Sequence, residues 1–425
     1  MNLHPHKLRS LAVTLAGLLA LGSGSAGHSR PTGTPAAAPA PSAVTPAAVS
    51  AAAAMSAAAM PAAAMPAAPE PSQDRSSDGR PRSSGTRGVK ITKEQERATE
   101  RGLAWLAREQ NQDGSWTAAV GFKLNNSYRS TSASAAHVGV TSLAGIAFLA
   151  GGHLPGRGEY GEALDRAVDF VLGCVQEDGY ITFAGTRMYS HAFATLFLAE
   201  IYGMTHREDV RLRLQKAIDF IVKCQNEEGG WRYVPLARES DMSIVVCQVL
   251  ALRAARNIGI RVPKSTVDLA IRYVVDSAVT GNQRRSIRYS ALGTFSYQRQ
   301  AQSRSTFPLT SAGVTALNGL GIYSDELIDR GVDFLNSQFD SFNRRYGSVG
   351  HYFFWYGHYY GVQAMYTKGG HDWVNYFTRL RELLIRYQRA DGSWPNETGP
   401  GAAFSTAMAC LILEIPYDFL PIFHR

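Results

Sequence analysis

The most constraining feature of this 425-residue chain is a motif that occurs three times: a glutamine, three residues, a glycine, one residue and a tryptophan. In each copy an amphipathic stretch, with apolar residues three and four positions apart, precedes the motif and indicates a helix with one buried face. The glycine can adopt the left-handed conformation that ends such a helix. A nearly uniformly apolar stretch follows and predicts a second helix that is covered on all sides. The three copies begin and end at Gln110 and Trp116, Gln225 and Trp231, and Gln388 and Trp394.

Weaker copies of the same unit extend the repeat to six helix pairs across residues 89–425. An open stack of such pairs would expose the apolar wall that the inner helices form, whereas a closed ring would cover it. We therefore predict an all-α fold, an α/α toroid in which six outer helices surround six inner ones. An open helical solenoid is the alternative. The inner helices are expected at residues 138–150, 192–202, 242–255, 312–320, 359–366 and 406–413.

The Gln-x3-Gly-x-Trp segments resemble the QW motif of the terpenoid cyclase and protein prenyltransferase superfamily, which includes the squalene–hopene cyclases. This resemblance covers essentially all of residues 89–425 and implies the toroid fold. It also implies a structural role for the glutamines and tryptophans, which in that family tie one outer helix to the next. A further implication is an isoprenoid or lipid-like ligand in the central cavity.

The resemblance does not extend to the catalytic residues of that family. Cyclases that begin by protonation carry an Asp-x-Asp-Asp motif, and the sequence contains none. Prenyltransferases bind zinc with an Asp-x-Cys pair and a distant histidine, and the nearest pair here, Asp241 and Cys247, has a different spacing. The resemblance therefore predicts the fold and a ligand class but no reaction, so whether the chain is an enzyme is left open.

Four polar residues are expected near the starts of inner helices. Helix N-termini that meet at one mouth of a barrel attract anions, and histidine and aspartate there can act as acid, base or metal ligand. The alternative is simple capping of the helices by side chains next to solvent. Asp241 is the best candidate for a catalytic acid, and no sequence motif supports a metal or any other cofactor, although a divalent metal is left open. The expected ring consists of His137, His191, Asp241 and His358.

Aromatic residues form a second group of candidates for the cavity wall. A run of five aromatic residues at positions 352–356 cannot point in one direction, so part of it should face the cavity or its mouth. Aromatic walls suit a polyisoprenoid, but aromatics at helical spacing also serve as ordinary core. The candidates for ligand contact are Tyr189, Trp355 and Tyr359.

The N-terminus predicts export. Lys7 and Arg9 precede an apolar run at residues 11–21 and small residues at 22–26, which is the pattern of a signal peptide spanning residues 1–26. Residues 27–88 are rich in alanine, proline and serine and predict a disordered linker. We therefore expect a periplasmic or extracellular protein of the cell envelope. An uncleaved N-terminal membrane anchor is the alternative.

The net charge of +8 does not indicate a nucleic-acid partner. Half of this excess lies in residues 1–88, where seven basic residues stand against three acidic ones. The main functional prediction is an exported toroid protein that binds or acts on an isoprenoid or lipid-like ligand. The alternatives are a non-catalytic cell-envelope scaffold with an unknown protein partner and a polysaccharide-acting α/α-barrel enzyme. For the enzyme, Glu239 and Asp241 form the one obvious carboxylate pair near the mouth.

Overall fold

The computed structural model describes residues 88–124, 126–280, 292–299 and 303–423. All of them belong to one structural unit, Gln73–Arg425. The predicted signal peptide, and all of the predicted linker except Gly88, lie outside the described residues.

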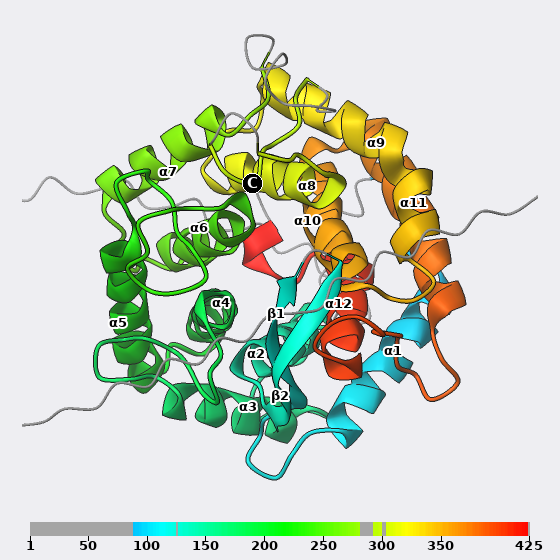
Figure 1. Ribbon diagram of the computed structural model, residues 1–425. Coiled ribbons are helices and arrows are strands. Elements are labelled where there is room, and N and C mark those ends of the chain that lie inside the picture. Colours follow the sequence, from blue (N-terminus) through cyan, green and yellow to red (C-terminus); the bar gives the residue numbers. More distant parts are fainter. Residues whose placement is uncertain (1–87, 125, 281–291, 300–302, 424–425) are drawn as a thin grey trace, which may run out of the picture. The chain divides into compact units, whose positions relative to one another are not determined.

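The described residues form two concentric rings of helices (Figure 1). Outer and inner helices alternate along the chain, as the repeat predicts. The outer helices are α1 (Lys93–Arg108), α3 (Gly161–Gly173), α5 (Glu208–Cys224), α7 (Lys264–Asp276), α9 (Glu326–Tyr346) and α11 (Gly370–Tyr387). The inner helices are α2 (Val138–Ala150), α4 (Met188–Thr205), α6 (Met242–Asn257), α8 (Phe307–Gly319), α10 (Tyr352–Lys368) and α12 (Ala402–Glu414).

The inner ring is closed. Each inner helix contacts the next one along the chain, and the last, α12, packs against the first, α2. Burial explains the two rings: every residue of α2 is buried, whereas α1 buries only one face, which includes Ala98, Leu103 and Leu106. The structure thus confirms the closed α/α toroid and excludes the open solenoid.

The glutamine of each motif joins neighbouring outer helices. Its side-chain amide donates a hydrogen bond to the carbonyl of its own motif's glycine and another to a carbonyl on the next outer helix. The bonds to the next helix run from Gln110 to Ala163 (2.8 Å), from Gln225 to Thr266 (2.9 Å) and from Gln388 to Ala98 (2.8 Å).

The tryptophan of each motif forms a hydrogen bond with the outer helix that precedes it in the chain. All three side chains are buried, and each indole N–H donates to a backbone carbonyl ten residues earlier in the chain. The acceptors are the carbonyls of Leu106 for Trp116, Ile221 for Trp231 and Leu384 for Trp394.

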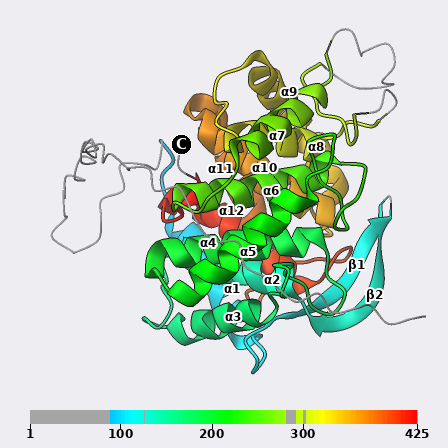
Figure 2. The ribbon, with the colours of Figure 1, turned by 90° about the vertical axis from the view of Figure 1, so that its left-hand side faces the viewer.

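The structure adds a β-hairpin that the sequence analysis did not predict. Strands β1 (Thr117–Leu124) and β2 (Ser127–Ala136) pair antiparallel and are inserted between α1 and α2. Figure 2 shows this hairpin at one end of the helical barrel. The backbone N–H of Ala119 donates to the carbonyl of Pro400 (2.8 Å), so β1 is bonded to the loop that precedes α12.

The last described residues lie at the end of the barrel away from the hairpin (Figure 2). Two short 3-10 helices, η1 (Ile415–Tyr417) and η2 (Pro421–Phe423), follow α12, and η2 packs against α6 and α10. Ile422 and Phe423 are buried there. Across the part of the chain that the structure describes, no helix combines the length and apolar character needed to cross a membrane.

Candidate ligand-binding site

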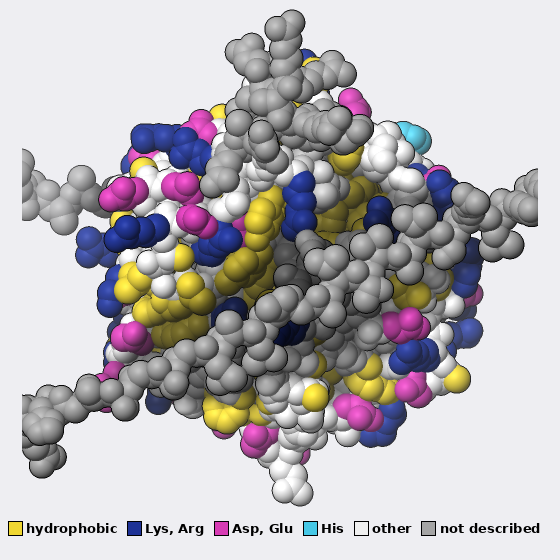
Figure 3. Space-filling view, in the orientation of Figure 1, with side chains coloured by type: hydrophobic (Ala, Val, Ile, Leu, Met, Phe, Trp, Pro, Cys, Tyr) yellow, Lys and Arg dark blue, Asp and Glu magenta, His cyan; other side chains and the backbone are white. Residues whose placement is uncertain are grey.

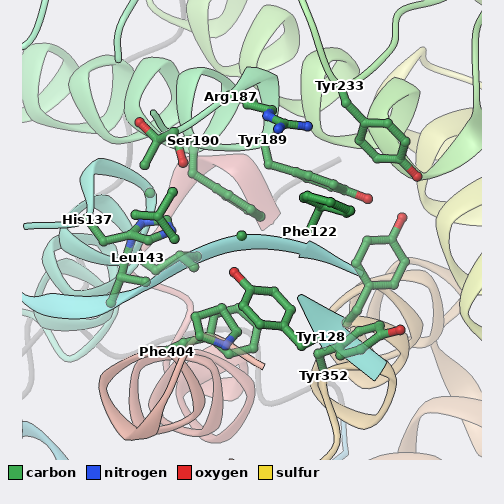
Figure 4. A pocket seen from close by; sticks show the side chains of 18 of the residues that line it. Phe122, Tyr128, His137, Leu143, Arg187, Tyr189, Ser190, Tyr233, Tyr352 and Phe404 are labelled. Atoms are coloured by element: carbon green, nitrogen blue, oxygen red, sulfur yellow. The ribbon is translucent and has the colours of Figure 1, made fainter. Parts of the chain in front are cut away.

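A pocket of about 250 Å³ lies between the hairpin and the N-terminal ends of inner helices (Figure 4). Its wall is dominated by aromatic and aliphatic side chains. The hairpin contributes Val120, Gly121, Phe122 and Tyr128; α2 and its cap contribute His137, Gly139, Val140 and Leu143; α4 and the three residues before it contribute Gly185, Thr186, Arg187, Tyr189, Ser190 and Phe193; the remainder are Tyr233, Tyr352, Phe353, Tyr356, Pro400, Phe404 and Met408.

Two hydrogen bonds attach the hairpin to the rest of the protein over this pocket. One is the bond from Ala119 to Pro400 described above. In the other, the His351 ring donates from Nε2 to the carbonyl of Asn126 at the hairpin turn (3.0 Å), because its Nδ1 already accepts from the N–H of Phe353. Within the hairpin, the Tyr128 hydroxyl on β2 donates to the carbonyl of Ala119 on β1 (2.9 Å).

Of the seven side chains expected to contact the ligand, His137 and Tyr189 line the pocket. His137 caps α2, and its Nδ1 accepts from the backbone N–H of Val140 (3.2 Å). Burial lowers the pKa of His137 to about 4, so its imidazole is neutral at pH 7. Burial likewise raises the pKa of the Tyr189 hydroxyl, which is therefore also neutral.

His191 does not join His137 in a ring, which corrects the sequence-based alignment. His191 lies one helical turn inside α4, where its Nδ1 accepts from the N–H of Ile181 (3.0 Å). The equivalent residue of α2 is Thr141, which accepts from the N–H of Trp116 in the same way (3.0 Å). The alignment therefore placed His191 four residues out of register, and burial lowers its pKa to about 3.

His358 also lies away from the pocket. Its Nε2 donates to Asn343 Oδ1 (2.7 Å) on α9, and its Nδ1 accepts from the Tyr376 hydroxyl (2.8 Å) on α11. Burial lowers the pKa of His358 to about 3. This histidine faces the outer helices, so the predicted ring of three histidines and an aspartate does not form.

Asp241 is the buried N-cap of α6. Its carboxylate accepts from the N–H groups of Ser243 (2.9 Å) and Ile244 (3.3 Å) and from the Ser243 hydroxyl. Burial and the nearby charge of Asp241 raise the pKa of Tyr297, whose hydroxyl bonds to that of Tyr233, a pocket residue. Asp241 itself is not among the residues that line the pocket.

The aromatic run on α10 divides between two sides of the helix, as its length required. Tyr352, Phe353 and Tyr356 line the pocket. Trp355 is buried elsewhere and donates from its indole nitrogen to the carbonyls of Gly350 (3.0 Å) and Pro395 (3.2 Å). Tyr359 lies behind the wall, with its ring 6.1 Å from that of the pocket residue Phe193.

The hairpin residues and Arg187 were missed by the sequence analysis. Arg187 is the one charged side chain in the described pocket wall. Its guanidinium carbon lies 5.3 Å from the centre of the Phe122 ring, and that of Arg129 lies 6.0 Å from the same ring. Residues 117–124 combine alanine, glycine and single aromatic and basic residues, so no periodic signal identified a strand there.

Carboxylates are absent from the described pocket wall. Glu239, the other member of the expected carboxylate pair, is exposed and forms an ion pair with Arg232 (2.8 Å). Within the described ranges no group of three histidine, cysteine, aspartate or glutamate residues could hold a metal ion. The pocket is therefore a largely apolar, aromatic chamber with a cationic rim.

Solved structures with a similar fold differ strongly in sequence. An inactive variant of an α-1,6-mannanase from Salegentibacter sp., in complex with α-1,6-mannotriose, aligns with a TM-score of 0.53 at 8% identity, covering 76% of this chain and 99% of that chain. A cellobiose 2-epimerase from Bacillus thermoamylovorans aligns with a TM-score of 0.51 at 11% identity, covering 76% and 98%. An α-amylase from Clostridium perfringens aligns with a TM-score of 0.51 at 9% identity, covering 76% and 97%. At these identities the similarity concerns the fold alone.

No curated protein is detectably similar to this chain in sequence. A family model does match, however: the prenyltransferase α/α-toroid domain matches residues 86–320, which is more than half of the chain. This match agrees with the repeat, the two rings of helices and the closed inner ring. The chain therefore belongs to the prenyltransferase α/α-toroid domain family.

Proposed function

We propose that this chain is an exported protein that binds an isoprenoid or another lipid-like molecule in the pocket beneath the hairpin. The observation that carries the proposal is the composition of the wall, in which aromatic and aliphatic side chains surround a space of about 250 Å³ without a carboxylate. Each Å² of apolar ligand surface that leaves water contributes roughly 25 cal/mol. The neutral forms of His137 and Tyr189 add no charge that would oppose such a ligand.

Binding rather than chemistry is the core of this proposal. The acid motifs of the cyclases and the zinc ligands of the prenyltransferases are absent from the sequence. Asp241 is the candidate acid for a reaction in this pocket, and its charge acts on Tyr297, whose hydroxyl bonds to that of the wall residue Tyr233.

A second candidate is a carbohydrate ligand. The similar solved structures named above are a mannanase, an epimerase and an amylase. In this chain the rings of Tyr128, Tyr189 and Tyr352 line the pocket and offer flat faces on which a sugar ring can stack. Glycoside hydrolysis, however, needs two carboxyl groups on either side of the scissile bond. The described wall supplies none, so this candidate is a saccharide-binding protein rather than a glycosidase.

The decisive experiment is identification of a co-purifying ligand. The full chain is purified from an exporting host, extracted with organic solvent and analysed by mass spectrometry. Thermal stabilisation is then measured with farnesol and squalene and, in parallel, with mannotriose and cellobiose. We expect a polyprenoid or other lipid in the extract and stabilisation by the apolar compounds only. Stabilisation by the oligosaccharides alone would replace the proposal with the second candidate.

A variant that fills the pocket provides the matched control. Met408 lines the wall, so Met408→Trp should abolish both co-purification and stabilisation. Leu212→Trp places the same side chain at an exposed position on α5 and should leave both unchanged. An empty extract with no stabilisation by any compound would overturn the proposal and leave the non-catalytic scaffold.

A further inference from the structure

The rim of the pocket carries two arginines that share one aromatic ring. Phe122 on β1 pairs directly with Arg129 on β2, which explains why the Arg129 guanidinium lies over the Phe122 ring. Arg187 approaches the same ring from the start of α4 (Figure 4). A guanidinium over an aromatic ring gains about 0.5–1 kcal/mol at an exposed site. The hairpin and α4 thus each place one cation beside the same aromatic ring, at 6.0 Å and 5.3 Å from its centre.

Neither of these arginines forms an ion pair with a described residue. Other arginines of the described chain do: Arg232 pairs with Glu239 at 2.8 Å and Arg299 with Asp276 at 2.6 Å. Figure 3 shows Lys and Arg side chains together with hydrophobic ones around the hollow of this face. Arg129 and Arg187 are both exposed, so their donors are free to bind an incoming anion.

The geometry of the guanidinium suits carboxylates and phosphates. Its planar donors match two oxygens of either group, and stacking on an aromatic ring restricts its motion before a ligand arrives. The start of α4 adds to the effect, because helix N-termini favour negative charge and the first turn of α4 has no acidic residue. An anion placed at Arg187 would lie directly beside the apolar chamber that Arg187 helps to line.

We propose that the ligand of this pocket is an anionic amphiphile, whose apolar chain occupies the chamber and whose carboxylate or phosphate group is bound by Arg187 and Arg129. This inference rests on the proposed function and narrows it: neither a neutral hydrocarbon nor a neutral sugar supplies the negative charge that a guanidinium binds most strongly. Phe122 is the positioning residue, because it contacts both cations and the chamber.

The test compares ligands that share one chain length. Binding of dodecanoate, dodecyl phosphate, dodecanol and inorganic phosphate to the full chain is measured by isothermal titration calorimetry at pH 7.5, below the critical micelle concentrations. A hydrogen bond to a charged group contributes enough to expect the two anionic amphiphiles to bind at least ~10-fold tighter than dodecanol. Inorganic phosphate should not bind measurably, because it lacks the apolar chain.

Three variants and one control locate the anion. Arg187→Gln and Arg129→Gln should each reduce the preference for dodecyl phosphate over dodecanol several-fold, because the affinity for dodecyl phosphate should fall much more than the affinity for dodecanol. Arg213→Gln, at an exposed position on α5, should change neither affinity. Phe122→Leu keeps an apolar wall but removes the aromatic ring, and should weaken the preference without abolishing dodecanol binding. Thermal unfolding of each variant shows that it is folded.

The possible outcomes separate the two proposals. Equal affinities for dodecanol and dodecyl phosphate would overturn the anionic amphiphile while leaving an apolar ligand intact. An anionic preference that persists in both arginine variants would also overturn it. Binding of inorganic phosphate as tight as that of dodecyl phosphate would show an anion site unrelated to the chamber. Failure of all three dodecyl compounds to bind would overturn the proposed function itself.

Discussion

The side-chain amide of Gln388 donates a hydrogen bond to the backbone carbonyl of Ala98 at 2.8 Å, across 290 positions of sequence. This bond joins the last outer helix, α11, to the first, α1, and so completes the outer ring. Gln110 makes the equivalent bond to Ala163 at 2.8 Å, but across only 53 positions. The same local chemistry thus closes the ring at one joint and links consecutive repeats at another.

Replacing Gln388 should loosen the two ends of the ring. Gln388→Met keeps the length of the side chain but leaves the Ala98 and Gly392 carbonyls without their donor, which costs about 1–3 kcal/mol of unfolding free energy. Because the bond from Gln388 to Ala98 closes the outer ring between α11 and α1, we expect amide hydrogen exchange to accelerate more in α1 and α11 than in the other helices. Exchange measured by mass spectrometry checks this. Gln110→Met, which removes the equivalent bond between consecutive repeats, is the matched control. If the exchange rates of α1 and α11 are the same in the two variants, the prediction is wrong.

The two rings of helices could be predicted from the sequence, but the residues at the mouth of the barrel could not. The reason lies in the hydrophobic pattern of the inner helices. An amphipathic helix such as α1 reveals its register, because its buried face repeats every three or four residues. A helix as apolar as α2 has no such face, so its sequence does not fix where it begins. His191 was consequently placed one turn too early in α4, and α10 begins at Tyr352 rather than at the expected residue 359. The hairpin that covers the pocket was not predicted for a related reason: its strands combine small residues with a few scattered aromatic ones, so no periodic signal identified them.

His191 should make the protein less stable in acid. Burial lowers its folded pKa to about 3, whereas an unfolded histidine titrates near 6.5. The unfolded state therefore binds the proton first, and stability is lost as the pH falls below about 6.5. The expected loss from this residue is about 1.4 kcal/mol per pH unit until the folded pKa is reached.

His191→Thr tests this contribution with the residue that other repeats use at the same position. Threonine can accept the N–H of Ile181 as Thr141 accepts that of Trp116. The variant should be less stable than the wild type at pH 7, because its smaller side chain leaves space, and the difference should shrink at pH 5. Urea unfolding at both values measures it. His371→Thr, at an exposed position on α11, should show the same difference at both pH values. If His191→Thr differs from the wild type in unfolding free energy by the same amount at pH 5 and at pH 7, the prediction is wrong.

The His351 bond to Asn126 should hold the tip of the hairpin over the pocket. His351→Phe preserves a flat ring but removes the donor, and should expose the backbone of residues 117–136 to hydrogen exchange about five-fold faster, the effect expected for a bond worth about 1 kcal/mol. His351→Gln keeps an amide donor and should restore part of the protection. Peptide-resolved exchange of the hairpin measures both. Unchanged protection in His351→Phe would show that the bond from Ala119 to Pro400 is sufficient to hold the hairpin in place.

Glu414 should destabilise the protein above acidic pH. Its side chain is buried at the end of α12 and neither carboxyl oxygen has a hydrogen-bond partner among the described residues, so burial raises its pKa well above the ordinary value. The folded state therefore retains the proton that an unfolded glutamate releases near pH 4.3. Stability from this group is complete below that pH and is lost as the pH rises toward the folded pKa. Glu414→Gln, which carries no charge at any pH, should raise the unfolding free energy at pH 7 and change it little at pH 4. Glu100→Gln, at an exposed position on α1, is the control and should have little effect at either pH. A gain of equal size at pH 4 and pH 7 would mean that the charge of Glu414 is not the cause.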